Sequence, residues 1–433
     1  MKKICKASFI ALLCCMLILP LLLVLSCTIP HQTIEKNTTQ SMDILYQEGM
    51  HPRFFLNSSG CMMDNFTDMI ILSEAMCVDE KKPIVSAMRS TMVGFGDELF
   101  ADNYKAFVQK EPVSFYRDYS WYWHGYLVAV RPLLVFTDFV GIRVINSVLM
   151  FGLALLIFIL AWKKLSIRAA IGFLLALVAS FFIVVPLSVQ YGSVFLIALT
   201  CSLLILTWDK VRTLPGGSAL FIIAGSMAAF LDLLTAPLVS FGIPAMFYLM
   251  FAKKNQKEDA HFLCGINRLF VIGISWCIGF AVMWCWKWLL GSLILGENII
   301  AAAMDEAAFM SVNKEETSLM QCLLMVSSFI TSLVSLPPIG HTILRLALVL
   351  LGGIGFLIYL FGFRSKAALI ENIPYLLVAL IPFAWCIVFL NHVTMHIWFV
   401  FRIFSLTAFG GTLFIAGTFS AEKCRQRLFR HKQ

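Results

Sequence analysis

The chain consists mostly of long apolar runs separated by short polar stretches, and this feature restricts its fold more than any other. Hydrophobic residues make up 60% of the 433 residues and charged residues only 13%, whereas soluble domains carry about 25% charged residues. An apolar run of about 20 residues spans a bilayer as one helix. A transmembrane β-barrel would instead show alternating segments of about 10 residues. The sequence therefore predicts an all-α, polytopic bundle of transmembrane helices.

About ten apolar runs are expected to cross the membrane. The sequence divides into a first transmembrane helix at 1–27, an extracytoplasmic region at 28–140, a bundle of about nine helices at 141–420 with an outer loop at 289–342, and a basic cytoplasmic tail at 421–433. The spans expected in the bundle lie near 143–162, 169–186, 193–207, 217–235, 237–252, 268–288, 343–363, 373–390 and 402–420.

The charges between the runs predict the orientation of the chain. Lys and Arg cluster in alternate gaps, such as Lys163-Lys164 and Lys253-Lys254, and in the C-terminal tail. Basic gaps face the cytoplasm, so we expect a plasma-membrane protein with both termini inside. The net charge of +8 is explained by these gaps and does not indicate nucleic-acid binding.

The end of the first run offers an alternative to a retained helix. Val24-Leu25-Ser26-Cys27 loosely resembles a lipoprotein cleavage box. Cleavage before Cys27 would remove one span and leave the other loops on the same sides of the membrane. Retention as a signal-anchor helix is the simpler interpretation, because many spans follow.

The extracytoplasmic region contains two aspartates at helical spacing. Asp64 and Asp68 are four residues apart, so they share a face if Met63 to Ala75 is helical. Two carboxylates held close together repel when both ionise, which raises one pKa or attracts a divalent cation. Either outcome suits general-base catalysis or metal binding. The alternative is a helix N-cap followed by a solvated aspartate.

A second set of candidates surrounds an aromatic segment at 119–126 (YSWYWHGY). Trp and Tyr gather at membrane interfaces, but an interface explains His124 and Arg131 less well. Aromatic rings also stack on sugars, and an arginine at the interface can bind a lipid phosphate. We therefore take His124 and Arg131 as candidate substrate-binding residues, with Tyr191 and Asp232 at outer helix junctions.

The last segment expected on the outer side, 391–398, carries two histidines, and an arginine follows it. His392 and His396 are four residues apart, and Arg402 follows at membrane depth. Ionisable groups near the end of a span usually face a cavity or a polar partner. Because no HExxH motif accompanies the histidines, the favoured hypothesis is that Arg402 binds an anion such as phosphate or diphosphate together with His392 or His396. Arg345 lies on the same side. An interfacial polar belt is the alternative.

Together these features give the chain a family likeness. The chain resembles the GT-C superfamily of polyprenyl-phosphate-dependent membrane glycosyltransferases. The features that carry the resemblance are the first helix, the large outer region with acidic Asp64 and Asp68, the short helices interrupted by Pro, and the late His-rich segment that reaches Arg402. The resemblance implies a GT-C-like fold and an outer-loop aspartate that acts as base or binds a metal. It also implies basic residues on the lipid phosphate, for which Arg402 and Arg345 are the candidates.

The expected function is therefore inverting transfer of a sugar from a polyprenyl-phosphate-linked donor to a cell-envelope acceptor outside the cytoplasm. The expected partners are membrane lipids, the lipid-linked donor and envelope-biosynthesis proteins, and a divalent cation is the one cofactor considered. The rival hypotheses are a transporter or flippase of a lipid-linked or anionic substrate, and a non-catalytic envelope-assembly protein. A groove that brings Asp64 and Asp68 together with Arg402 would favour the transferase.

Overall fold

The computed structural model describes residues 2–55, 58–94, 100–113, 115–254, 261–311 and 341–429, with only the backbone described for 100–101, 261–262, 341–349 and 429. This part of the chain is helical apart from one small two-stranded sheet. The predicted all-α character is therefore confirmed for the described residues.

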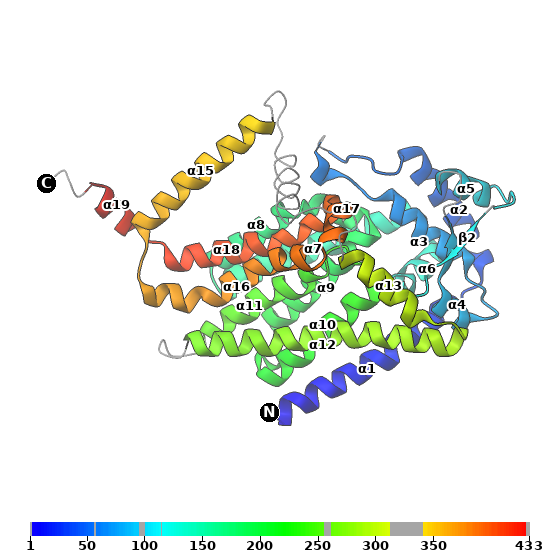
Figure 1. The fold of residues 1–433 in the computed structure, drawn as a ribbon, viewed down its shortest axis with the longest axis horizontal. Helices are drawn as coiled ribbons and strands as arrows, with labels where there is room; N and C mark the ends of the chain where they lie inside the picture. The colour runs from blue at the N-terminus through cyan, green and yellow to red at the C-terminus, as the bar shows by residue number, and fades with distance from the viewer. Residues whose placement is uncertain are drawn as a thin grey trace.

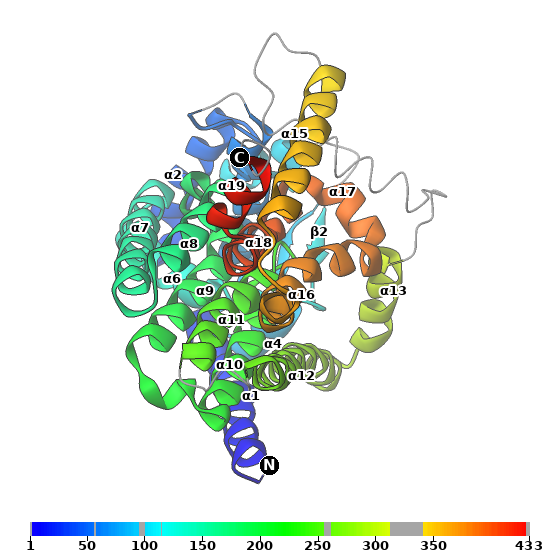
Figure 2. The same cartoon turned by 90° about the vertical axis from the view of Figure 1, so that its left-hand side faces the viewer.

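A bundle of helices makes up the body of the molecule (Figure 1), and Figure 2 shows this bundle from one end. It contains α1 (Lys2–Cys27), α7 (Phe139–Lys164), α8 (Ile167–Ala179), α9 (Val189–Thr207), α10 (Leu214–Leu231), α11 (Leu238–Lys254), α12 (His261–Leu295), α13 (Ile299–Ser311), α16 (Lys366–Val388), α17 (Leu390–Val400) and α18 (Ser405–Thr418). Two further helices, α15 (His341–Gly362) and α19 (Ala421–Phe429), project from the end of the bundle where the C-terminus lies. Short 3-10 helices join some of them: η2 (Phe182–Leu187), η3 (Asp209–Arg212) and η5 (Phe401–Phe404).

The length and apolar composition of these helices fit a multi-pass membrane protein. Among the described residues, seven segments are long and apolar enough to cross a bilayer, one of them running through α17, η5 and α18. Of the other predicted spans, α8 has 13 residues and α11 has 17, fewer than the roughly 20 that a straight crossing requires. The count of ten therefore stays a prediction.

Small residues bring α10 and α12 together. A Cβ atom at Gly225 would collide with the backbone of Trp276, and one at Gly279 would collide with that of Ile222. The Ser226 hydroxyl also donates to the carbonyl of Gly279 at 3.3 Å. Close backbone approach at small residues is how membrane helices associate, because apolar side chains gain little from leaving lipid.

The residues between α1 and α7 fold against one end of the bundle, at the right of Figure 1. They form α2 (His31–Glu48), η1 (Ser59–Cys61), α3 (Asn65–Cys77), α4 (Pro83–Arg89), β1 (Thr91–Val93), α5 (Phe100–Val108), β2 (Tyr116–Asp118) and α6 (Leu127–Phe136). The two strands pair antiparallel, with Thr91 opposite Asp118. We call this part the outer region, after the extracytoplasmic position that the sequence predicts for it.

The helix α12 joins the outer region to the bundle. It has 35 residues, about 52 Å at 1.5 Å per residue, and it extends well past the roughly 30 Å hydrocarbon core of a bilayer. Near its C-terminal end the buried Lys287 ammonium donates to the carbonyls of Ala87 and Met88 at 3.1 and 2.9 Å. These carbonyls belong to the last turn of α4, where a cation is stabilised by the helix dipole.

Candidate functional site

Asp64 lies fully buried at the start of α3, where the outer region meets the bundle. Its Oδ1 accepts a hydrogen bond from the Thr67 amide at 3.1 Å, which makes it the N-cap of the helix. Its own amide donates to Ser188 Oγ at 3.0 Å. Burial raises the pKa of the carboxyl, against the opposing effects of nearby groups that include His51 and Arg402. Oδ2 has no hydrogen-bond partner among the described residues.

Asp68 is also fully buried, so the alternative of a solvated aspartate is wrong for this residue. Its Oδ1 accepts a hydrogen bond from the amide of Val189, the first residue of α9, at 3.0 Å. The carboxylate thus caps a second helix from outside it. Burial raises its pKa well above the usual value, while Arg143 acts to lower it. The two aspartates share a helix end but have different surroundings.

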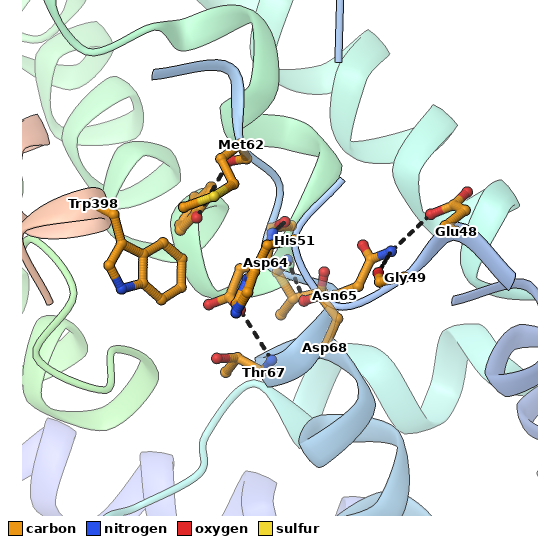
Figure 3. A network of polar contacts seen from close by, with 12 residues as sticks. Glu48, Gly49, His51, Met62, Asp64, Asn65, Thr67, Asp68 and Trp398 are labelled. Carbon is orange, nitrogen blue, oxygen red and sulfur yellow. Dashed lines mark hydrogen bonds and ion pairs between the residues drawn. The ribbon is translucent and has the colours of Figure 1, made fainter. Parts of the chain in front are cut away.

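A histidine that sequence reasoning did not select completes the surroundings of Asp64. His51 Nδ1 lies 3.8 Å from Asp64 Oδ1, and the His51 side chain is 38% exposed. The His51 ring packs edge-on against Trp398 of α17, with the centroids 4.7 Å apart. Figure 3 shows Trp398 facing the His51–Asp64 pair across the gap between the outer region and α17. No spacing signal marked His51, because the contact depends on how the outer region docks.

Arg402 lies at the same junction and is fully buried in η5. Its guanidinium carbon is 3.8 Å from the centre of the Tyr191 ring, and the Tyr191 hydroxyl donates to the carbonyl of Met62 at 3.4 Å. Nη1 makes long contacts of 3.4 Å to the carbonyls of Trp398 and Phe399 in the preceding helix, α17. Among the described residues, Nε and Nη2 have no hydrogen-bond partner of normal geometry.

Arg143 holds the rest of this junction in place. Its Nη1 contacts both carboxylate oxygens of Glu48 at 2.9 Å, its Nη2 donates to Asn65 Oδ1 at 2.8 Å, and its Nε donates to the carbonyl of Leu187. The Asn65 amide in turn donates to Glu48 and Gly49 (Figure 3). The arginine at the start of a span was a detectable signal, since an ionisable group there needs a partner.

A large apolar groove adjoins the buried arginine. Its volume is about 930 Å³. It is bounded by α7, α8, η2 and η5, and its walls include Leu155, Phe173, Phe181 and Phe401. Phe401 lines the groove and directly precedes Arg402 in the chain, while Arg402 itself is fully buried and is not a lining residue. Cys61 of η1 also lines the groove. The groove therefore borders the segment that leads to Asp64.

The structure places His124 elsewhere, in a closed cluster. Its Nδ1 lies 2.8 Å from Glu74 Oε1 and 2.6 Å from the Tyr126 hydroxyl, and its Nε2 donates to the carbonyl of Tyr119 at 2.9 Å. The Tyr126 hydroxyl donates to the other oxygen of Glu74. Glu74 was not predicted, although it falls on α3 ten residues after Asp64.

Arg131 is likewise tied to the interior of the protein, and its hydrogen bonds to the described residues go to backbone carbonyls. Its Nε donates to Ser26 at 2.9 Å, and its two terminal nitrogens donate to Ala75 and Ile29. The side chain is fully buried beside Cys27, which ends α1 and has no exposed surface. This geometry ties the end of the first helix to α3 and does not bring Arg131 to Arg402.

The remaining candidates lie in or near α17. The rings of His392 and His396 are 5.1 Å apart, as their spacing predicts. His392 Nε2 donates to the carbonyl of Leu234 at 2.9 Å, and His396 interrupts the helix with φ −127°. Asp232 caps the end of α10 and is buried next to the Thr235 hydroxyl and the turn that follows.

Two predictions remain open. Arg345 lies in α15, and its side chain is outside the described residues. Within the described ranges, no group of three His, Cys, Asp or Glu side chains is arranged to hold a metal, so a divalent cation at Asp64 and Asp68 stays a prediction. The structure thus brings together Asp64, Asp68, Tyr191 and Arg402 from the predicted set.

Comparison with protein-family models, with curated proteins and with solved structures finds no match to this chain.

Proposed function

We propose that the protein is a membrane glycosyltransferase that takes its sugar from a polyprenyl-phosphate carrier and transfers it outside the cytoplasm. The observation that carries the proposal is the position of Arg402. Arg402 is fully buried, two of its guanidinium nitrogens have no hydrogen-bond partner of normal geometry among the described residues, and the preceding residue, Phe401, lines an apolar groove of about 930 Å³. A buried cation needs an anionic partner, and Arg binds phosphate through several parallel hydrogen bonds.

The groove supports a lipid as the source of that anion. Its walls are almost entirely aromatic and aliphatic, as an isoprenoid chain requires. A lipid whose tail fills the groove would reach Arg402 with its phosphate past Phe401, the lining residue that precedes the arginine in the chain. A free phosphate ion would use the arginine but not the groove.

The carboxylate of Asp64 supplies the second part of the chemistry. The acceptor hydroxyl oxygen attacks the anomeric carbon, and its proton passes to Asp64 Oδ2. The bond between the anomeric carbon and the phosphate oxygen breaks, and its electron pair leaves on the phosphate, which Arg402 stabilises. One such displacement inverts the anomeric centre. His51 beside Asp64 stabilises the ionised carboxylate that the step requires.

The proposal also fixes an orientation. The site lies at the outer face of the plasma membrane, and both termini lie in the cytoplasm, because the basic gaps mark the inner face. Fusion of a periplasmically active reporter to the C-terminus should give no signal, and a cytoplasmically active one should give a strong signal. The reverse result would place the site on the wrong side for this reaction.

Lipid binding gives the direct test. Purified full-length protein is titrated with undecaprenyl phosphate and with undecaprenol, and the bound lipid is counted by native mass spectrometry. We expect binding of the phosphate at least about tenfold tighter, with the preference lost in Arg402→Gln. Leu155→Trp, which narrows the groove, should weaken both lipids.

The matched control is Arg168→Gln, an exposed arginine at the other end of α8, which should keep the preference. Equal affinity for the two lipids, or an unchanged preference in Arg402→Gln, would overturn the proposed phosphate site. Transfer itself is tested by mass analysis of envelope glycans in cells with and without the gene, with Asp64→Asn in place of the wild type as the inactive variant.

A further inference from the structure

A second cavity lies where α12, α13 and the start of α17 meet the aromatic segment of the outer region. Its volume is about 250 Å³. The side chains that line it include Trp121, Tyr122, Trp284, Trp288, Glu306 and Phe389. Neither Asp64 nor Arg402 takes part, so the cavity is separate from the site described above. A cavity of about 150 Å³ already accommodates a benzene ring, so this one has room for a substituted six-membered ring.

The walls of this cavity are aromatic rings set at steep angles to one another. Tyr122 and Trp284 meet edge to face with their centroids 4.9 Å apart, and Trp284 and Trp288 are inclined by 51° at 6.0 Å. Rings in this arrangement present flat carbon surfaces on more than one side of a space. A ligand that fits it must present an apolar face of its own.

Two indole donors at this cavity are without partners. Among the described residues, the Nε1 atoms of Trp121 and Trp284 are buried and make no hydrogen bond. The third tryptophan differs, because Trp288 Nε1 donates to the carbonyl of Trp121 at 3.1 Å. Buried donors are almost always paired in native proteins, so a ligand whose entry moves these rings apart would supply the acceptors that both indoles lack. Glu306 also lies on the cavity wall.

Two alternatives explain less. An interfacial belt accounts for tryptophans near a helix end, but belt residues keep their polar edge in water, and these two indole nitrogens are buried. An aromatic cage for a cation is the second alternative, but a cation would leave both indole donors unpaired.

We propose that this cavity is a binding subsite for one pyranose ring of a neutral saccharide. A pyranose has a C–H face that packs on aromatic rings and hydroxyl groups at its edge that accept from indole N–H and donate to a carboxylate. The assignment of the ligand to the saccharides rests on the proposed function. The helix α17 links the two sites, since Phe389 at its N-cap lines the cavity and Trp398 contacts His51. Nine residues of helix correspond to about 14 Å, so the subsite would hold a ring of a saccharide whose other end reaches Asp64.

The test measures binding without any transfer reaction. Purified full-length protein in nanodiscs is mixed with methyl glycosides of glucose, galactose, mannose and N-acetylglucosamine, and with choline as the cationic probe. Saturation-transfer NMR reports which ligand protons contact the protein. We expect at least one glycoside to receive saturation at its ring C–H protons, and choline to receive none.

Three variants locate the binding. Ala307→Trp, at an exposed position on the cavity wall, fills the space and should abolish the signal without disturbing the fold. Trp284→Phe keeps a ring and removes the N–H, and should weaken affinity about tenfold, as expected for one hydrogen bond. Glu306→Gln keeps an acceptor and should retain most of the signal. The control Trp162→Ala, at an exposed position on α7, should change nothing.

The outcomes separate this inference from the proposed function. Absence of a glycoside signal, a signal that survives Ala307→Trp, or binding of choline that depends on Glu306 would each overturn the saccharide subsite. If glycosides bind as expected while undecaprenyl phosphate is not preferred over undecaprenol, the subsite stands and the proposed transferase falls. If the lipid preference holds and no glycoside binds, the reverse conclusion follows.

Discussion

The helix α3 carries two buried carboxylates that each face a histidine, and the two pairs differ in how completely they are closed. Glu74 and His124 are both about fully buried and lie 2.8 Å apart. Asp64 is fully buried too, but His51 is 38% exposed and stands 3.8 Å away. A buried carboxylate therefore faces a buried histidine near one end of α3 and a partly exposed histidine at the other end.

The difference separates a structural pair from a chemically available one. Each carboxylate has one oxygen without a hydrogen bond among the described residues, Oε1 of Glu74 and Oδ2 of Asp64, so the contrast lies in the histidines. His124 is buried and lies 2.8 Å from Glu74 Oε1, so a proton can enter that pair only if the cluster opens. His51 beside Asp64 is 38% exposed, and a buried arginine is close by.

Removing each carboxylate in turn tests most directly whether the Asp64 pair is catalytic and the Glu74 pair structural. Asp64→Asn keeps the N-cap acceptor and removes the base, so we expect sugar transfer to fall by about 10²–10⁴-fold with little change in melting temperature. Transfer is measured with purified protein and normalised to folded material. Unchanged transfer would mean that the open pair is not the catalytic one.

Glu74→Ala should give the opposite result. Removing one partner of a buried, hydrogen-bonded pair costs about 3–5 kcal/mol, so the free energy of unfolding in detergent should drop by that order. Activity per folded molecule should be retained. The matched control is Glu80→Ala, which breaks an exposed pair with His31 and should cost much less. Equal losses in the two variants would show that the Glu74 cluster is not a structural lock.

The pH dependence of transfer sharpens the assignment of Asp64. Burial raises the pKa of its carboxyl above the usual value of 3.8, and a base must be ionised, so the rate should increase with pH through that raised pKa. His51 favours the ionised form, so His51→Gln should move the acid limb to higher pH. His31→Gln, far from the site in the chain and paired with Glu80, should leave the limb in place.

The smallest effect is expected at Asp68. Burial raises its pKa well above the usual value, so the native state favours the protonated form and loses stability as pH rises through the raised pKa. Asp68→Asn keeps an acceptor for the Val189 amide and removes this penalty. Its melting temperature should therefore equal or slightly exceed that of the wild type, with the gain larger at pH 8 than at pH 5. A gain that is larger at pH 5 would contradict the direction of the shift.

The sequence predicted parts of the site because those parts depend on local spacing. Asp64 and Asp68 share the start of one helix, and the rings of His392 and His396 lie 5.1 Å apart within one segment, as an interval of four residues predicts. His51, Glu74 and Arg143 were not predicted, because their partners lie on other elements. The interval between His51 and Trp398 in the chain carries no information about their contact.

What the sequence by itself determined is a helical membrane protein with its polar residues concentrated in a few segments. Apolar length and charge position decide this, since a bilayer accepts only backbone whose hydrogen bonds are internal. The tertiary structure decided which polar residues are closed off and which remain open. His124 and Arg131 became internal contacts, while Arg402 came to lie beside a groove and near Asp64. The reason is physical: burial and hydrogen-bond completion are properties of the packed assembly, and no single segment encodes them.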